Sequence, residues 1–395
     1  MRLSITREVA IPDPVKLERL RRAPEFGPKI LFFSGGSALK DACRELVAFS
    51  HNSIHIITPF DSGGSSAILR QAFAMPAVGD FRNRLMALAD QSLTGNPEIY
   101  DLFAHRLDKK ASAGELDLEL KSLALGRHHL IRRVPDPMRK ILRNHCRAFM
   151  GLMPAGFNLR GASVGNLVLT AGYLDSRRQF DTVIYLFSKL VGAQGVVRPV
   201  VNKNLHLAAR LAGGEVVIGQ HLLTGKEAPV LTQRIEKLWL TRDLSDPEPV
   251  TATVRPKIAQ RIAEADLICY PIGSFYSSLV ANLLPSGVGR AVAANPCPKV
   301  YVPNTGSDPE LVGLSLTDQV RVLMGYLNAD HDRIEPGRVL GFVLVDAKNG
   351  VYPGGLEALA LRKLGVAVID CPLVTKQSAP LLDPGLLAQA LASLT

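Results

Sequence analysis

The sequence is short of the residues that mark secreted, zinc-binding and nucleic-acid-binding proteins. Its five cysteines are far apart and form neither a Cys-x-x-Cys pair nor a Cys/His cluster at zinc spacing, so a disulfide framework and a zinc site are not expected. Aromatic residues make up only 6% of the chain, and no basic run is interleaved with them. Nucleic acid is therefore not an expected partner.

Long apolar runs are also absent. Residues 1–14 mix charges into their apolar positions, unlike a signal peptide, and no stretch reaches the ~18 apolar residues of a transmembrane helix. We therefore expect a cytoplasmic protein with no membrane partner. The 395 residues, 47% of them hydrophobic, are enough for a large α/β core. The net charge of +10 suits phosphate-bearing ligands, but it also suits simple solubility.

Residues 53–66 join a strand pattern to a helix pattern through a glycine-containing loop. Residues 53–58 are β-branched and apolar, as in a buried parallel strand, and apolar residues recur at helical spacing after Ser66. The glycines let the backbone approach a bound group, the serines add hydroxyl donors, and the first N–H groups of the helix attract an anion. The loop suits a phosphate, although an ordinary tight turn has the same composition.

The same unit of strand, small-residue turn and helix recurs twice, with its strand at residues 29–33 and at residues 265–270. This repetition predicts an α/β fold with a Rossmann-like, open, mostly parallel sheet and helices on both faces. The strand ends then meet at one edge, where open α/β sheets bind ligands. The residues expected to bind nucleotide phosphates are Gly35, Gly36, Ser37, Gly63, Gly64, Ser65, Ser66, Asn83, Asn166, Gly273 and Ser274.

Asp61, Asp80 and Arg82 are the candidate catalytic residues. Displacement at phosphorus needs charge neutralisation and alignment, which Arg82 and a divalent cation held by Asp61 or Asp80 would supply. Asp61 is alternatively the acceptor for the proton of an attacking hydroxyl. Mg²⁺ is thus the metal ion expected if this site holds one, and no tightly bound organic cofactor is expected.

The order of these motifs resembles the CofD/YvcK family over roughly residues 29–330. The match is nearer to the YvcK-type motifs, and a separate CofD-like branch is a further interpretation. The matching segments are Asp-Ser-Gly-Gly-Ser-Ser from Asp61, Gly-Asp-Phe-Arg-Asn from Gly79, Gly-Ala-Ser-Val-Gly-Asn from Gly161, and Ile-Gly-Ser-Phe-Tyr-Ser-Ser from Ile272.

The resemblance implies two functions of different class. In the transferase branch, an alcohol attacks the β-phosphate of a guanosine-diphosphate-linked three-carbon acid and GMP is released. On the YvcK side, a UDP-sugar is bound for regulation and turnover is not assumed. The partner is accordingly a nucleoside diphosphate conjugate or a nucleotide sugar, and a homodimer is expected. The paired aspartates favour a transferase, whereas the closer motif match favours a regulator. A scaffold with a relic site is a third reading, because Ala38 and Ile272 stand where the family has further glycines.

The remaining patterns predict the organisation of the chain. Residues 1–28 form an N-terminal extension with a short basic helix, and residues 29–395 form one α/β domain. That domain carries a helical insertion at about 95–155 and a β-hairpin at about 205–223, whose Gly-Gly turn needs no ligand.

Within the insertion, residues 127–147 contain seven Arg or Lys against one Asp. A solvated helical face explains this charge better than a lid that closes on phosphate. His128, His129 and His145 raise the question of a metal site, but their spacing does not place them on one helical face.

Overall fold

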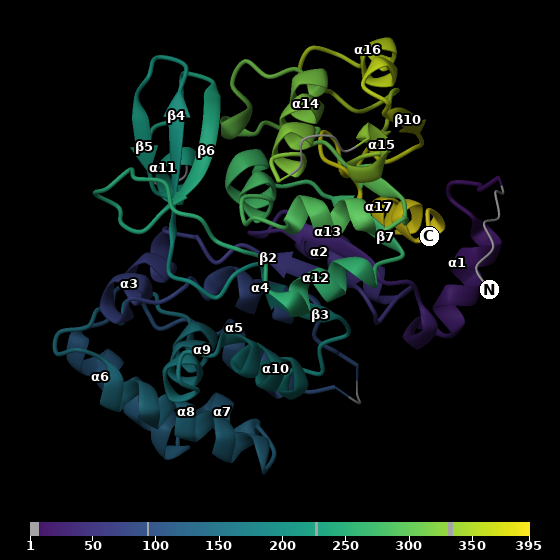
Figure 1. The fold of residues 1–395 in the computed structure, drawn as a ribbon. Coiled ribbons are helices and arrows are strands. Elements are labelled where there is room, and N and C mark those ends of the chain that lie inside the picture. Colours follow the sequence, from purple (N-terminus) through teal and green to yellow (C-terminus); the bar gives the residue numbers. More distant parts are fainter. Residues whose placement is uncertain (1–7, 93–94, 226–227, 331–334) are drawn as a thin grey trace.

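The computed structural model describes residues 8–92, 95–225, 228–330 and 335–395, and its main feature is a seven-stranded parallel sheet (Figure 1). The order across the sheet is β10-β9-β8-β7-β1-β2-β3, and every neighbouring pair is parallel. The predicted Rossmann-like class is confirmed. The strands are β1 (Ile30–Ser34), β2 (Ile54–Ile57), β3 (Val196–Pro199), β7 (Leu267–Tyr270), β8 (Lys299–Tyr301), β9 (Phe342–Val345) and β10 (Ala367–Asp370).

Alternate residues of β1 enter two separate cores, because successive side chains of a strand point to opposite faces. Ile30 and Phe32 belong to one core, whereas Leu31 and Phe33 belong to the other. The first core includes α2 (Lys40–Val47), α4 (Gly79–Ala87), α9 (Val164–Asp175), α10 (Phe180–Leu190) and α17 (Pro384–Ser393). The second includes α12 (Pro256–Ala263), α13 (Val288–Ala294), α14 (Leu316–Leu327), α15 (Pro336–Val339) and α16 (Ala358–Lys363).

The direction of winding reverses at β1. The chain proceeds from β1 to β2 and β3 on one side, and later from β7 to β10 on the other, so that β1 lies between β2 and β7. Loops that leave β1 and β7 therefore diverge at their carboxyl ends and leave a crevice, which is the usual ligand site of doubly wound sheets.

The predicted insertion contains α5 (Pro97–Ala104), α6 (Ala113–Leu125), α7 (His129–Arg133) and α8 (Met138–Leu152). In Figure 1, α6, α7 and α8 lie together on the side of the molecule away from α14 and α16. A Ser112 capping box starts α6, and Gly126 ends it in the left-handed conformation. The basic side chains of residues 127–147 are exposed or half-buried, as a solvated face requires.

The predicted β-hairpin forms, but its extent was wrong. β4 (His206–Leu211) pairs with β5 (Val216–Ile218), whereas residues 220–223 of the predicted second strand form α11 (Gln220–Leu223). β6 (Ile235–Thr241) adds a third antiparallel strand along the whole of β4. An isolated hairpin is only marginally stable, and β6 provides the further strand that such a unit needs.

The described part of the predicted N-terminal extension forms α1 (Pro14–Arg22), and residues 1–7 lie outside the described residues. Asp13 caps α1 by accepting a hydrogen bond from the Lys16 N–H, and its own N–H donates to Ser393 of α17. In the described part of the chain, no helix is long and apolar enough to cross a bilayer.

Candidate functional site

A cavity of about 590 Å³ opens at the carboxyl ends of β1, β2 and β7. It lies where the winding reverses, as expected for a ligand site of an open α/β sheet. Twelve of the fourteen predicted site residues line it: Gly36, Ser37, Asp61, Gly63, Gly64, Ser65, Ser66, Asp80, Arg82, Asn83, Asn166 and Ser274.

Arg70 fixes the turn between β2 and α3 (Gly64–Phe73). Its buried guanidinium donates to the backbone carbonyls of Phe60, Asp61 and Leu205, at 2.6–3.0 Å. Burial lowers the pKa of Arg70 to about 10, while the nearby Asp61 opposes that shift. Arg70 thus holds the backbone of Asp61 against the small β-sheet, and the position of the Asp61 carboxylate follows from this anchoring.

The N-terminus of α4 lies beside the Asp61 carboxylate. Asp61 Oδ1 accepts the Gly63 N–H at 3.0 Å. A Cβ on Gly79 would stand 3.6 Å from Asp61 Oδ2 and only 2.8 Å from Ser66 Oγ, so the approach requires glycine. α4 begins at Gly79, which places Asp80 in its first turn.

Arg82 and Asn166 each bring a buried polar atom without a hydrogen-bond partner among the described residues. Arg82 is 8% exposed, and its Nη2 donates to Asn83 Oδ1 at 2.6 Å, but its Nη1 has no partner. Asn166 donates from Nδ2 to Ser65 Oγ, and its Oδ1 is unpartnered. Burial, and next the charge of Arg106, lower the pKa of Arg82 to about 10. Buried polar atoms are normally satisfied, and because Arg82 and Asn166 both line the cavity, these two atoms are available to hydrogen-bond a bound group.

Three further cations, which the sequence patterns did not single out, line the same cavity: Arg106, Lys109 and Arg160. The two segments that carry them are paired by backbone hydrogen bonds, from Leu107 N to Ala162 O and from Gly161 N to Leu107 O. Arg106 also donates to the Gly161 carbonyl. Arg106 and Lys109 lie between α5 and α6, whereas Arg160 lies between α8 and α9, so that no short sequence window contains all three.

The turn after β7 differs from the expectation. Gly273 lines an adjoining cavity of about 360 Å³, and its N–H, expected to meet a phosphate, donates to Asn304 Oδ1 at 2.9 Å. The following amides of residues 275–277 donate to the carboxylates of Asp308 and Glu310. Side chains of residues 304–310 therefore already occupy these donors. Ser274 lines both cavities and joins them.

Gly35 lines neither of these two cavities. A Cβ there would meet Ser278 Oγ at 2.9 Å and Thr58 Oγ1 at 3.1 Å, so this glycine is needed where the ends of three strands converge. Gly36 has φ +43° and open space around its Cβ position. Of the two glycines, only Gly36 is placed to bring backbone to a ligand.

The element after the hairpin also belongs to the cavity. The cavity is also lined there by Gln220, His221 and Thr224, which no sequence motif indicates as site residues. His221 Nδ1 lies 2.8 Å from Ser62 Oγ, and its N–H donates to the same hydroxyl. This contact couples α11 to the glycine turn after β2.

The lining residues include four cationic side chains against two carboxylates, Asp61 and Asp80. Such an excess of positive charge in a partly enclosed space favours an anion with two or more charges. Asp61 and Asp80 supply two carboxylates, which is the donor set that Mg²⁺ uses together with phosphate oxygens and water. The residues present thus fit both a diphosphate and its metal ion.

Residues 30–373 match the family model described as 2-phospho-L-lactate transferase CofD. The chain belongs to the CofD family. It is 31% identical over 297 residues to the gluconeogenesis factor of Bacillus subtilis, covering 75% of this chain and 74% of that protein. It is 29% identical over 298 residues to a putative gluconeogenesis factor of a Nostoc species, covering 75% of this chain but only 52% of the relative.

A solved structure has the same fold. It is a UPF0052-family protein of Bacillus halodurans, with a TM-score of 0.66, 23% identity, and coverage of 92% of this chain and 98% of that one. The resemblance seen in the motifs is thereby confirmed at the level of family and fold.

Proposed function

We propose that this CofD-family protein binds a nucleoside diphosphate conjugate in the cavity and transfers a phosphorus-containing group from it to a hydroxyl acceptor. The observation that carries the proposal is the pair of unpartnered buried atoms, Arg82 Nη1 and Asn166 Oδ1, in a cavity with four cations. A diphosphate accepts hydrogen bonds from the guanidinium, and a hydroxyl of the conjugate or the acceptor donates to the amide oxygen.

The size and layout of the space support the same ligand class. The main cavity of about 590 Å³ and the adjoining one of about 360 Å³ meet at Ser274 and Thr224. Small-molecule sites usually have ~300–1,000 Å³, so the two together hold a conjugate and an acceptor. The diphosphate lies at Gly36 and at the start of α3, facing Arg82.

Each charged residue has a role in the transfer step. The acceptor hydroxyl attacks phosphorus, its proton passes to the Asp61 carboxylate, and the nucleoside monophosphate leaves with the electrons of the broken P–O bond. Arg82, with Arg106 and Lys109, neutralises the charge that develops on the phosphate oxygens. Asp80 would hold Mg²⁺, or Asp61 would do so in place of its role as proton acceptor, and the ion supplies Lewis-acid stabilisation of those oxygens when bound.

A second candidate function is favoured by the names of the relatives. Both curated relatives are called gluconeogenesis factors, established or putative, rather than transferases. The same cavity then acts as the sensing site of a regulator that binds a nucleotide sugar without turnover. Both functions share the binding step and differ only in whether a product is released.

Mass spectrometry of reaction mixtures separates the two. Wild-type protein is incubated with Mg²⁺, guanosine- or uridine-diphosphate conjugates and hydroxyl acceptors, and released nucleoside monophosphate is measured. We expect release, and Asp61→Asn should lower its rate on the order of a hundredfold or more while the conjugate still binds. Asp175→Asn, an exposed carboxylate at the end of α9, is the matched control and should change nothing. Binding without release would support the regulator, and absence of binding would defeat both functions.

A further inference from the structure

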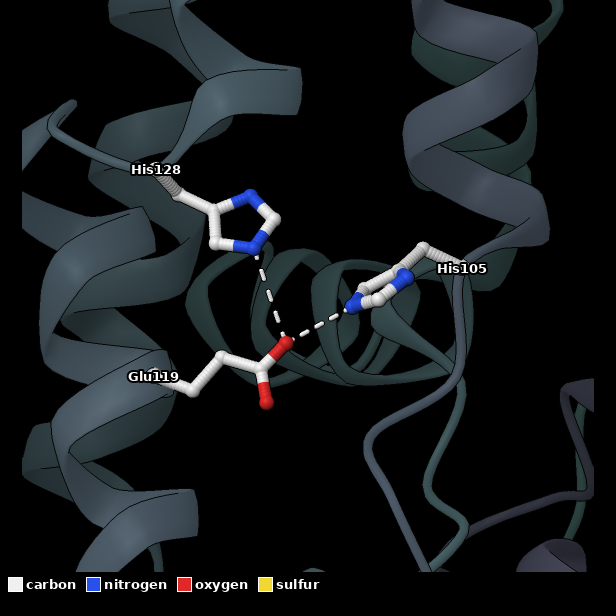
Figure 2. A group of neighbouring side chains, drawn as sticks. All are labelled: His105, Glu119 and His128. Atoms are coloured by element: carbon white, nitrogen blue, oxygen red, sulfur yellow. Dashed lines mark hydrogen bonds and ion pairs between the residues drawn. The ribbon is translucent and has the colours of Figure 1, made fainter.

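A second cluster of chemically reactive side chains lies in the helical insertion, outside the cavity. It consists of His105, Glu119 and His128, whose donor atoms all lie within 4.8 Å of one another. The three come from different elements: His105 follows α5, Glu119 is on α6, and His128 immediately precedes α7. Figure 2 shows that both imidazole rings turn a nitrogen toward the carboxylate of Glu119.

The distances from Glu119 to the two imidazoles are close to those between the ligands of one metal ion. His105 Nε2 lies 2.7 Å and His128 Nε2 lies 3.5 Å from the same oxygen, Glu119 Oε1. In a tetrahedral zinc site, with metal–ligand bonds of ~2.0–2.1 Å, two ligand atoms are about 3.3 Å apart. The two separations from Glu119 bracket this value, and all three ligand atoms lie within 4.8 Å of one another, so side-chain rotations would bring them to one ion. Two imidazole nitrogens and one carboxylate oxygen are a known ligand set of zinc.

The electrostatics of Glu119 point the same way. The side chains are only partly exposed, at 26% for His105 and Glu119 and 11% for His128. Among the described residues, the only ion-pair partners of Glu119 within 4.0 Å are these two imidazoles, which carry charge only when protonated. A half-buried carboxylate without a permanent countercharge is costly, and a divalent cation would provide that charge.

We propose that His105, Glu119 and His128 bind a divalent transition-metal ion of the zinc class, which joins the end of α5 to α6 and α7. Both rings coordinate through Nε2, and in each neutral ring the Nε2 proton moves to Nδ1. In His128 the proton then lies on Nδ1, so the long hydrogen bond of 3.3 Å that this nitrogen accepts from Leu130 N–H is lost. The remaining coordination positions are filled by water, which reaches the cluster because its side chains are partly exposed.

The location gives the ion a consequence for the cavity. His105 directly precedes Arg106, whose side chain lines the cavity, and the His105 carbonyl accepts the Val164 N–H at the start of α9. α9 in turn carries Asn166 into the cavity. A metal ion at His105 therefore restrains the backbone on which two cavity residues depend.

Cobalt titration tests the site directly. Full-length protein is stripped with a chelator and dialysed, and Co²⁺ is added without nucleotide while the visible d–d bands of low-coordinate cobalt are recorded. One equivalent should bind and be displaced by Zn²⁺. Glu119→Gln, which keeps the shape and a hydrogen-bond acceptor, should weaken Co²⁺ binding at least tenfold, and His105→Gln combined with His128→Gln should abolish the bands.

A neighbouring histidine provides the control. His129 is exposed and its ring lies 4.4 Å from that of His128, but it is not part of the cluster, so His129→Gln should leave the titration unchanged. Hydrogen exchange should show residues 105–130 more protected with Zn²⁺ than without. Failure of wild-type protein to bind, or an affinity that Glu119→Gln leaves unchanged, would overturn the proposal. Asp61→Asn should leave the cobalt bands unchanged, which would show that Co²⁺ binds at this cluster and not at the expected Mg²⁺ site of the cavity.

Discussion

Replacing Arg82 by methionine should stabilise the ligand-free protein, although Arg82 is buried. The lowering of its pKa from 12.5 to about 10 means that the folded protein holds the charged form of Arg82 at a cost of roughly 3 kcal/mol relative to water. Methionine keeps the apolar stem that packs at Gly165, where a Cβ would stand 2.9 Å from Arg82 Cδ. The hydrogen bond to Asn83 is lost in this variant, which offsets about 1 kcal/mol of the gain from removing the buried charge. We expect the free energy of unfolding to rise by about 1–2 kcal/mol.

Arg70 is the matched comparison because its pKa is also lowered to about 10 by burial. Unlike Arg82, it donates to three backbone carbonyls, of Phe60, Asp61 and Leu205. Arg70→Met leaves these buried acceptors without donors, which should lower the free energy of unfolding by about 3–5 kcal/mol.

Urea unfolding followed by circular dichroism, at neutral pH and without ligand, measures both variants. The two substitutions should move the midpoint in opposite directions. If Arg82→Met destabilised the protein as much as Arg70→Met, then Arg82 would be a satisfied structural residue, and the argument from its unpartnered Nη1 would fail.

Two further predictions concern the fold. Burial, and next the charge of Arg70, lower the pKa of His206 to about 4. The contribution of His206 to stability is therefore present above pH 6.5 and is lost as the pH falls toward 4. At about pH 4.5 we expect His206→Gln to reduce the acid-induced loss of unfolding free energy by about 1 kcal/mol, a value lowered for partial exposure, and an unchanged loss would refute this. In α13, a Cβ on Gly289 would stand 1.9 Å from Leu327 O, so Gly289→Ala should lower the melting temperature strongly. Gly325 in α14 has open space around its Cβ position, so Gly325→Ala should add up to ~1 kcal/mol of stability and raise the melting temperature slightly. Equal melting temperatures of the two variants would contradict this packing.

Local sequence patterns predicted the parts of the fold and site that depend on local chemistry. The strand and glycine turn before α3 are recognisable because a buried parallel strand, two glycines and a helix start occur within residues 53–66. The convergence of the turns after β1 and β2 follows from strand direction alone, and Gly36 and Gly64 do line one cavity.

Features made by distant contacts were not predictable in this way. The Gly273 amide is taken by Asn304, 31 residues away, and Arg160 reaches the cavity because residues 107 and 161–162 pair across the insertion. The cluster of His105, Glu119 and His128 was not predictable for the same reason. In the sequence, the histidines nearest to His128 in its own segment are His129 and His145, but its partners in the fold are His105 and Glu119 on other elements. No local spacing encodes such a set.

Isothermal titration calorimetry with wild-type protein and Arg82→Met tests the central claim most directly. Guanosine- and uridine-diphosphate conjugates are titrated with Mg²⁺, and Arg132→Met, an exposed cation on α7, serves as the control. At least one conjugate should bind wild type and the control at one site with equal affinity, and Arg82→Met should bind it on the order of 10- to 100-fold more weakly. Absence of binding to every conjugate, or equal affinity in Arg82→Met, would contradict the assignment of this cavity to a nucleoside diphosphate.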